Sequence, residues 1–302
     1  MVFVIYLTFL IFFAIVLNYF LIEKNILISE TGDIHQKFAS KSKVPLTGGI
    51  LFFLSILFFF NLGILSFILF SFIILILGIF SDLKFIKSAK LRLLFQVIIV
   101  LTFIIFNDIR ITDTRVHLID NILTNQILNY VFVCFCILIL MNGSNFFDGL
   151  NTLNIGYYLL VYLTIFYLNI NGELVLQDLL INNIFYIILF IYILNFFNKI
   201  FLGDSGSYLL GFIFSVFLID LYEMNSQISP FFVILLLWYP CYETLFSIIR
   251  KNILKKSPMS PDSNHLHQLI YLFIKKKIVK NTLYANLISA HIINFYNLLL
   301  FL

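Results

Sequence analysis

Short polar segments interrupt long apolar runs in this sequence, and they hold the side chains best suited to chemistry. Asp82 ends one apolar run, Asp148 lies between two runs, and Asp204 stands at the start of another. A carboxylate at the edge of hydrocarbon is costly unless a cation or a cavity compensates it, and Lys199 is the only basic residue near Asp204 in the sequence. Magnesium usually binds through one or two carboxylates plus substrate phosphates. We therefore expect a phosphate-handling site in which Asp204 holds Mg²⁺, with Mn²⁺ as the alternative.

Two glycines frame Asp204. Gly203 and Gly206 carry no side chain, which would let a ligand phosphate approach the backbone closely. An apolar run follows directly, so the unpaired N–H groups and the positive dipole end of its helix would point at the same place. The simpler alternative is that Asp204 or Ser205 only caps this helix.

Asp148 and Asp82 admit similar alternatives. Asn142 and Asn145 are three residues apart, which on a helical turn places both amides on the same face as Asp148. Asp148 could instead be a helix cap, and Asp82 could be a solvated, ion-paired loop residue. Only the three carboxylates together favour a common site.

Two histidines form the last polar cluster. His265 and His267 stand two residues apart in a proline-containing loop, where imidazoles could donate hydrogen bonds to phosphate oxygens or shuttle a proton. A zinc site is discounted because zinc needs more ligands and no cysteine is near. Glu243 follows Pro240 near the end of another apolar run, and a buried glutamate there indicates a side chain that faces the site.

The elements that must position these residues are membrane helices. The sequence is 62% hydrophobic and 11% charged with a mean hydropathy of +1.05, which excludes an ordinary soluble protein, and nothing in it indicates binding to nucleic acid. A span needs about 20 apolar residues, and a helix satisfies every backbone group in lipid. We predict an all-α polytopic membrane protein, a single domain over residues 1–302, with about ten spans. They lie near 1–22, 47–62, 64–80, 91–107, 124–141, 153–170, 179–197, 207–224, 230–250 and 282–302.

Basic residues predict which face of the membrane carries the site. With ten alternating spans, 17 of the 19 lysines and arginines fall at one set of connections, leaving Arg110 and Arg115 opposite. This bias makes the first face cytoplasmic, in a multi-pass protein of the inner membrane. The polar clusters share that face, where the net charge of +4 would attract anionic headgroups and phosphorylated ligands. Alternatively, the asymmetry is a topology signal only.

At these segments the sequence resembles the polyprenyl-phosphate N-acetylhexosamine-1-phosphate transferase family. The likeness extends over nearly the whole chain and rests on motifs that are specific together, although each is weak alone. The matching segments are 35–37, 45–49, 78–82, 142–150, 201–207 and 264–267.

The resemblance implies an enzyme of the phospho-sugar transferase type. A polyprenyl (undecaprenyl) phosphate would attack the sugar-linked phosphate of a UDP-sugar, giving a lipid diphosphate sugar and UMP. This reaction would start a lipid-linked surface glycan, such as that of a lipopolysaccharide. The implied partners are Mg²⁺, the UDP-sugar and the membrane lipid, and a homodimer is compatible with the family. Positioning and charge neutralisation are what phosphoryl transfer demands.

The resemblance also implies roles for particular residues. Asp204 would hold the metal, Asp82 would sit by the acceptor phosphate, and Phe201 would stack on uracil. The catalytic set would be Asp82, Asp148, Asp204 and His265. The set that contacts substrate would be Lys37, Asn142, Asn145, Asn151, Phe201, Gly203, Ser205 and His267.

Three positions depart from the family pattern. Ser81 replaces the first of two paired aspartates, Asn151 replaces a second aspartate in the Asp148 segment, and Gln268 replaces a third histidine. A catalytically impaired relative is therefore one alternative. A transporter or flippase is another, but transporters place such carboxylates near the bilayer midplane, whereas these cluster at predicted helix ends.

Overall fold

The computed structural model describes residues 2–29, 43–58, 65–169, 174, 184–255 and 264–302. Within these ranges the chain is helical, and the only strand-like feature is an isolated antiparallel bridge between Ile28 and Pro45. The helices are α1 (Val2–Lys24), α2 (Gly48–Phe58), α3 (Leu65–Asp82), α4 (Ala89–Asn107), α5 (His117–Leu123), α6 (Gln126–Phe147), α7 (Leu153–Leu168), α9 (Ile184–Phe196), α10 (Gly203–Met224), α11 (Pro230–Leu236), α12 (Trp238–Ile253), α13 (Leu266–Lys277) and α14 (Thr282–Phe301). The all-α fold is confirmed for the described residues.

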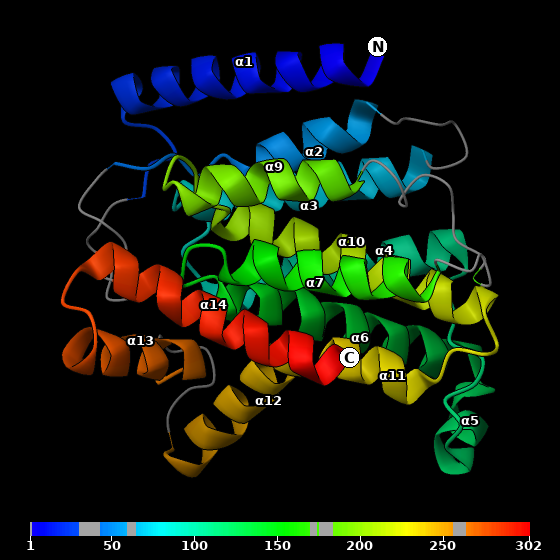
Figure 1. Cartoon of the computed structure of the whole chain (residues 1–302). Helices are drawn as coiled ribbons and strands as arrows, with labels where there is room; N and C mark the ends of the chain where they lie inside the picture. Colours follow the sequence, from blue (N-terminus) through cyan, green and yellow to red (C-terminus); the bar gives the residue numbers. More distant parts are fainter. Residues whose placement is uncertain (1, 30–42, 59–64, 170–173, 175–183, 256–263) are drawn as a thin grey trace.

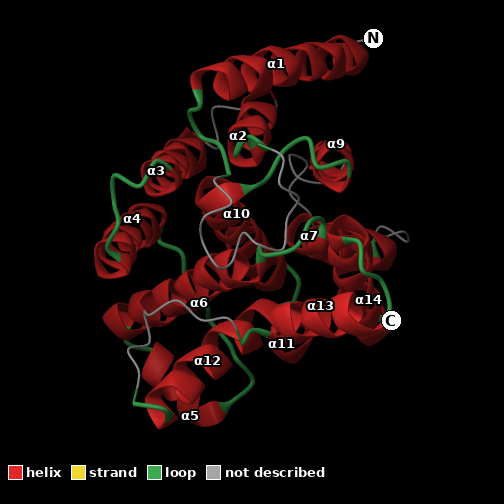
Figure 2. Cartoon of the chain, turned by 90° about the vertical axis from the view of Figure 1, so that its left-hand side faces the viewer, coloured by secondary structure: helices red, strands yellow, loops and turns green. Residues whose placement is uncertain are grey.

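Helix α10 forms the centre of a bundle. Figure 2 looks along the bundle and shows α10 enclosed by α2, α3, α6 and α7, while α1 lies outermost against α2 (Figure 1). Sixteen of the 22 residues of α10 are buried. Three glycines permit this close packing, because a Cβ atom at Gly49, Gly78 or Gly211 would lie 2.3–2.6 Å from backbone of the neighbouring helix. Small residues are the usual means by which membrane helices approach closely.

The described helices support a multi-pass membrane protein. Six of them are long and apolar enough to span a bilayer, and α11 with α12 could form a seventh, bent span. The other predicted spans near 47–62, 153–170 and 179–197 fall on shorter apolar helices, α2, α7 and α9. Each predicted span thus falls on a helix or a helix pair, but a count of ten spans stays a prediction.

The predicted span over 230–250 is sharply bent. Its two halves, α11 and α12, meet at an angle of 74°. Pro240 has no N–H and cannot bond the carbonyl of Leu236 four residues earlier, so the helical ladder breaks there. The hydroxyl of Tyr157 on α7 donates to that carbonyl at 2.6 Å. A buried tyrosine therefore donates to the carbonyl oxygen that the proline leaves without a backbone partner.

Candidate active site

Three carboxylates meet at one end of the bundle. Asp82 is the last residue of α3, Asp148 directly follows α6, and Asp204 is the second residue of α10. Helix α5 connects α4 to α6 at the opposite, right-hand end in Figure 1, so the carboxylates lie at the left-hand end. The backbone N–H of Asp204 donates to Asp82 Oδ1 at 2.8 Å. Asp148 is near enough for the charges of both other aspartates to act on it.

Asp82 caps the N-terminus of α10. Its Oδ1 accepts from the N–H of Asp204, and its Oδ2 accepts from the N–H of Ser205 at 3.1 Å. Gly203 has φ +70°, and a Cβ atom there would lie 2.8 Å from Asp82 Oδ2. The glycine and the helix N-terminus were predicted to bind a ligand phosphate, but in the structure they contact the protein's own carboxylate. Asp82 is the capping residue here, in place of Asp204 or Ser205.

Asp204 is compensated by an arginine. Arg92 Nη1 lies 2.7 Å from Asp204 Oδ2, the hydroxyl of Ser81 donates to the same oxygen, and Asn145 Nδ2 donates to Oδ1 at 2.8 Å. The Asp204 side chain remains 24% exposed. This basic partner is remote in the sequence, since helix packing brings Arg92 from α4 across 112 residues.

Arg92 is a candidate site residue that the sequence reasoning missed. The sequence analysis uses it only as a topology signal, although a basic residue inside the predicted span 91–107 is itself a sign of function. Arg92 Nη1 also donates to Ser81 Oγ at 2.8 Å. Ser81, which departs from the paired aspartates of the family pattern, thus links the guanidinium to Asp204 through its hydroxyl.

Asp148 has a less polar environment. Ser207 Oγ donates to Asp148 Oδ2 at 2.9 Å, and Asn154 Nδ2 donates to that hydroxyl oxygen at 3.2 Å. Protein atoms surround the carboxyl group closely, so desolvation raises the pKa of Asp148 well above its usual range. The Ser207 and Asn154 side chains oppose this shift, and the nearby aspartates add to it.

The segment that contains His265 and His267, called here the histidine segment, packs against residues 146–149 around Asp148, called here the Asp148 corner. His265 Nδ1 lies 2.7 Å from Glu243 Oε2, and the two imidazole rings are stacked with centroids 5.7 Å apart. A Cβ atom at Gly149 would lie 2.6 Å from His267 Nε2. The ring of Phe146, next to Asn145, is 5.6 Å from that of His265. The fold therefore joins the predicted histidines to the segment that carries Asp148.

Two predicted substrate-binding amides have structural partners. Asn142 Nδ2 donates to Gln96 Oε1 at 3.0 Å, which joins α6 to α4. Asn151 Nδ2 donates to Asn195 O at 3.3 Å and to Asn198 Oδ1 at 3.1 Å, near the end of α9. Neither amide bonds a site carboxylate, and a role for either in binding substrate stays a prediction.

Phe201 and Ser205 lie around the start of α10. Phe201 is partly exposed two residues before α10, and its N–H donates to Pro45 O at 2.9 Å. Ser205 is buried, and its N–H is used by Asp82. Lys37 lies outside the described residues. Stacking of Phe201 on a base stays a prediction.

The carboxylates of the site are compatible with a metal ion whose coordination is completed by substrate oxygens. In the described residues no three His, Cys, Asp or Glu side chains form a ready metal cage. A carboxylate offers about four acceptor positions, and Asp204 uses three of them for Arg92, Ser81 and Asn145. Magnesium bound through one or two carboxylates plus phosphate oxygens is compatible with this arrangement, because it needs only one position from each carboxylate.

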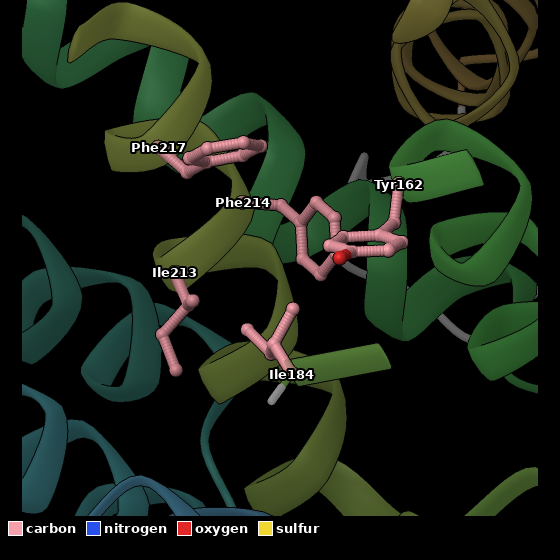
Figure 3. Close-up of a pocket in the computed structure, with 5 residues that line it drawn as sticks. All are labelled: Tyr162, Ile184, Ile213, Phe214 and Phe217. Atoms are coloured by element: carbon pink, nitrogen blue, oxygen red, sulfur yellow. The ribbon is translucent and has the colours of Figure 1, made fainter. Parts of the chain in front are cut away.

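A pocket elsewhere in the bundle lacks such chemistry. Figure 3 shows Tyr162, Ile184, Ile213, Phe214 and Phe217 converging between α7, α9 and α10. Four of these five side chains are fully apolar, and none is acidic or basic. We therefore place the candidate site at the carboxylates.

Fold and site together define a multi-pass helical membrane protein with an acidic centre at one end of its bundle. The chain belongs to glycosyl transferase family 4, whose family model matches residues 64–222. It is 32% identical over 206 residues to a probable undecaprenyl-phosphate N-acetylglucosaminyl 1-phosphate transferase of Bacillus subtilis, covering 67% of this chain and 57% of that protein. It is 31% identical over 228 residues to an undecaprenyl-phosphate alpha-N-acetylglucosaminyl 1-phosphate transferase of Thermotoga maritima, covering 75% and 67%. The match thus spans between about half and two thirds of these relatives.

Proposed function

We propose that this protein transfers a sugar-1-phosphate, N-acetylhexosamine-1-phosphate by our expectation, from a UDP-sugar to polyprenyl phosphate and releases UMP. The observation that carries the proposal is the convergence of Asp82, Asp148, Asp204 and Arg92 from α3, α4, α6 and α10 at one end of the bundle. The family supports it, as do the two relatives, whose names specify transfer of N-acetylglucosaminyl 1-phosphate to undecaprenyl phosphate.

The site offers charge neutralisation and positioning. Arg92 is a fixed cation that can pair with phosphate oxygens as well as with Asp204. Asp204, with Asp148 as a second carboxylate nearby, would hold Mg²⁺, which neutralises phosphate oxygens when bound. A lipid phosphate is already ionised near neutral pH, so the acceptor needs no strong base. His265 and His267 would donate hydrogen bonds to the diphosphate of the sugar nucleotide.

The location of the carboxylates favours an enzyme over a transporter. Asp82 and Asp204 lie at the ends of their helices, where a lipid headgroup phosphate and a water-soluble nucleotide could meet. A transport site would be expected near the bilayer midplane. The distribution of basic residues supports a cytoplasmic position for this end.

The test is turnover in membranes that contain the protein. The membranes are incubated with Mg²⁺, undecaprenyl phosphate and labelled UDP-N-acetylglucosamine, then assayed for UMP and labelled lipid. We expect both products, and a loss of about 100-fold or more in Asp204→Asn and in Arg92→Gln, because each variant removes a charge at the reacting phosphates.

The matched control is Glu223→Gln, a carboxylate at the opposite end of α10 that bonds Thr112. It should retain full turnover. The assay is repeated with other labelled UDP-N-acetylhexosamines and with a reference transferase as a positive control. Absence of both products with every sugar nucleotide, while the reference is active, would reject the proposal and favour a transporter or an impaired relative. Retained turnover in Asp204→Asn would remove the metal assignment.

A further inference from the structure

We infer that Glu243 is a positioning residue, which sets the orientation of the His265 imidazole and fixes the start of α13 beside the Asp148 corner. The inference rests on the proposed function, in which His265 meets the diphosphate. Glu243 lies on α12, outside all the segments that carry the other site residues.

Both oxygens of Glu243 bind the histidine segment. Oε2 lies 2.7 Å from His265 Nδ1, and Oε1 accepts from the N–H of Leu266 at 2.9 Å. The Glu243 side chain is only 3% exposed, and that of His265 is 6% exposed. A buried carboxylate costs free energy unless its partners are well placed, so this contact is a specific one.

The contact determines which ring nitrogen faces outward. When Nδ1–H donates to a carboxylate, Nε2 is the nitrogen that remains to meet a substrate oxygen. Nε2 can donate to a phosphate oxygen only when it too carries a proton. Glutamine would change this, because its amide can donate to Nδ1 and select the other neutral tautomer.

The same segment makes further contacts. His267 Nδ1 lies 3.8 Å from Glu243 Oε1, and its Nε2 faces Gly149, the residue after Asp148. Phe146 packs on His265, and Lys251, two turns along α12 from Glu243, lies 5.9 Å from the Phe146 ring. Helix α12 thus carries an inward polar face that contacts both the histidine segment and the end of α6.

A double-mutant cycle separates positioning from simple folding. Turnover is measured for Glu243→Gln, His265→Ala and the double variant, with thermal unfolding in detergent for each. We expect Glu243→Gln to lower kcat about 10- to 100-fold with little change in KM, as removal of an orienting partner does. The double variant should lose no more than His265→Ala, because Glu243 acts through that ring. Ser247→Ala is the control, since Ser247 is buried one turn further on the same face of α12.

A second measurement does not depend on turnover. Nitrogen NMR of the His265 ring, assigned by its disappearance in His265→Ala, should report a proton on Nδ1 in the parent and an altered state in Glu243→Gln. Identical spectra, multiplicative losses in the cycle, or full activity of Glu243→Gln would each overturn the inference. A parent that releases no UMP while its His265 signal responds to Glu243→Gln would instead count against the proposed function alone.

Discussion

Asp148 is partly buried, and burial raises the pKa of its carboxyl group, so the free energy of unfolding should depend on pH. Its folded-state pKa is raised, so the folded protein binds a proton that the unfolded chain releases above its ordinary pKa of about 4. The contribution of Asp148 to stability therefore falls as pH rises from that value toward the folded pKa.

Replacing Asp148 by asparagine removes the cost of ionisation and keeps the shape. We expect Asp148→Asn to unfold at the same temperature as the parent or a higher one, with an advantage that grows from pH 5 to pH 8, while UMP release falls at least tenfold. Thermal unfolding in detergent at several pH values checks this. A variant that is less stable at pH 8 than the parent would contradict the cost assigned to ionising Asp148.

At the scale of elements, the start of α10 depends on a glycine. Gly203 adopts a positive φ and lies against Asp82. Gly203→Ala should therefore lower the free energy of unfolding by about 1–3 kcal/mol, from backbone strain and from displacement of the carboxylate that caps α10. Gly149→Ala is the comparison, because its Cβ would meet only the tip of the His267 ring. It should lose activity with a smaller loss of stability, and equal destabilisation by the two changes would contradict this account.

The junction of α11 and α12 depends on a hydroxyl group. Tyr157→Phe removes the donor to Leu236 O and leaves a buried acceptor unpaired, at a cost of about 1–3 kcal/mol. In a Pro240→Ala background the backbone can supply that hydrogen bond, so the same change should cost less. Thermal unfolding of the four proteins measures the difference, and an equal cost in both backgrounds would disprove the link between Tyr157 and Pro240.

At the scale of the whole molecule, the orientation in the membrane can be tested with single cysteines. Cys134, Cys136 and Cys241 are free and would first be replaced by alanine. Lys87→Cys, in the exposed connection beside the site, should react with a membrane-impermeant maleimide only after cells are permeabilised. Asn121→Cys on α5, at the other end of the bundle, should react in intact cells. The reverse pattern would place the acidic centre on the outer face.

The sequence alone was enough to predict the helices and their approximate positions. It also predicted the three aspartates of the candidate site, but not Arg92. Apolar runs of this length can satisfy their backbone in lipid only as helices. Asp82, Asp148 and Asp204 were visible because each interrupts or borders an apolar run. His265 and His267 were predicted with them, and the structure brings both to the Asp148 corner.

Tertiary structure decided which groups neutralise and orient these residues. Arg92 and Ser81 meet Asp204 from α4 and α3, and Glu243 meets His265 from α12. Such pairs are set by how helices pack, because contacts between distant segments leave no fixed spacing in the chain. The bend at Pro240 likewise depends on a hydroxyl from α7, which only the folded bundle places beside the unpaired carbonyl.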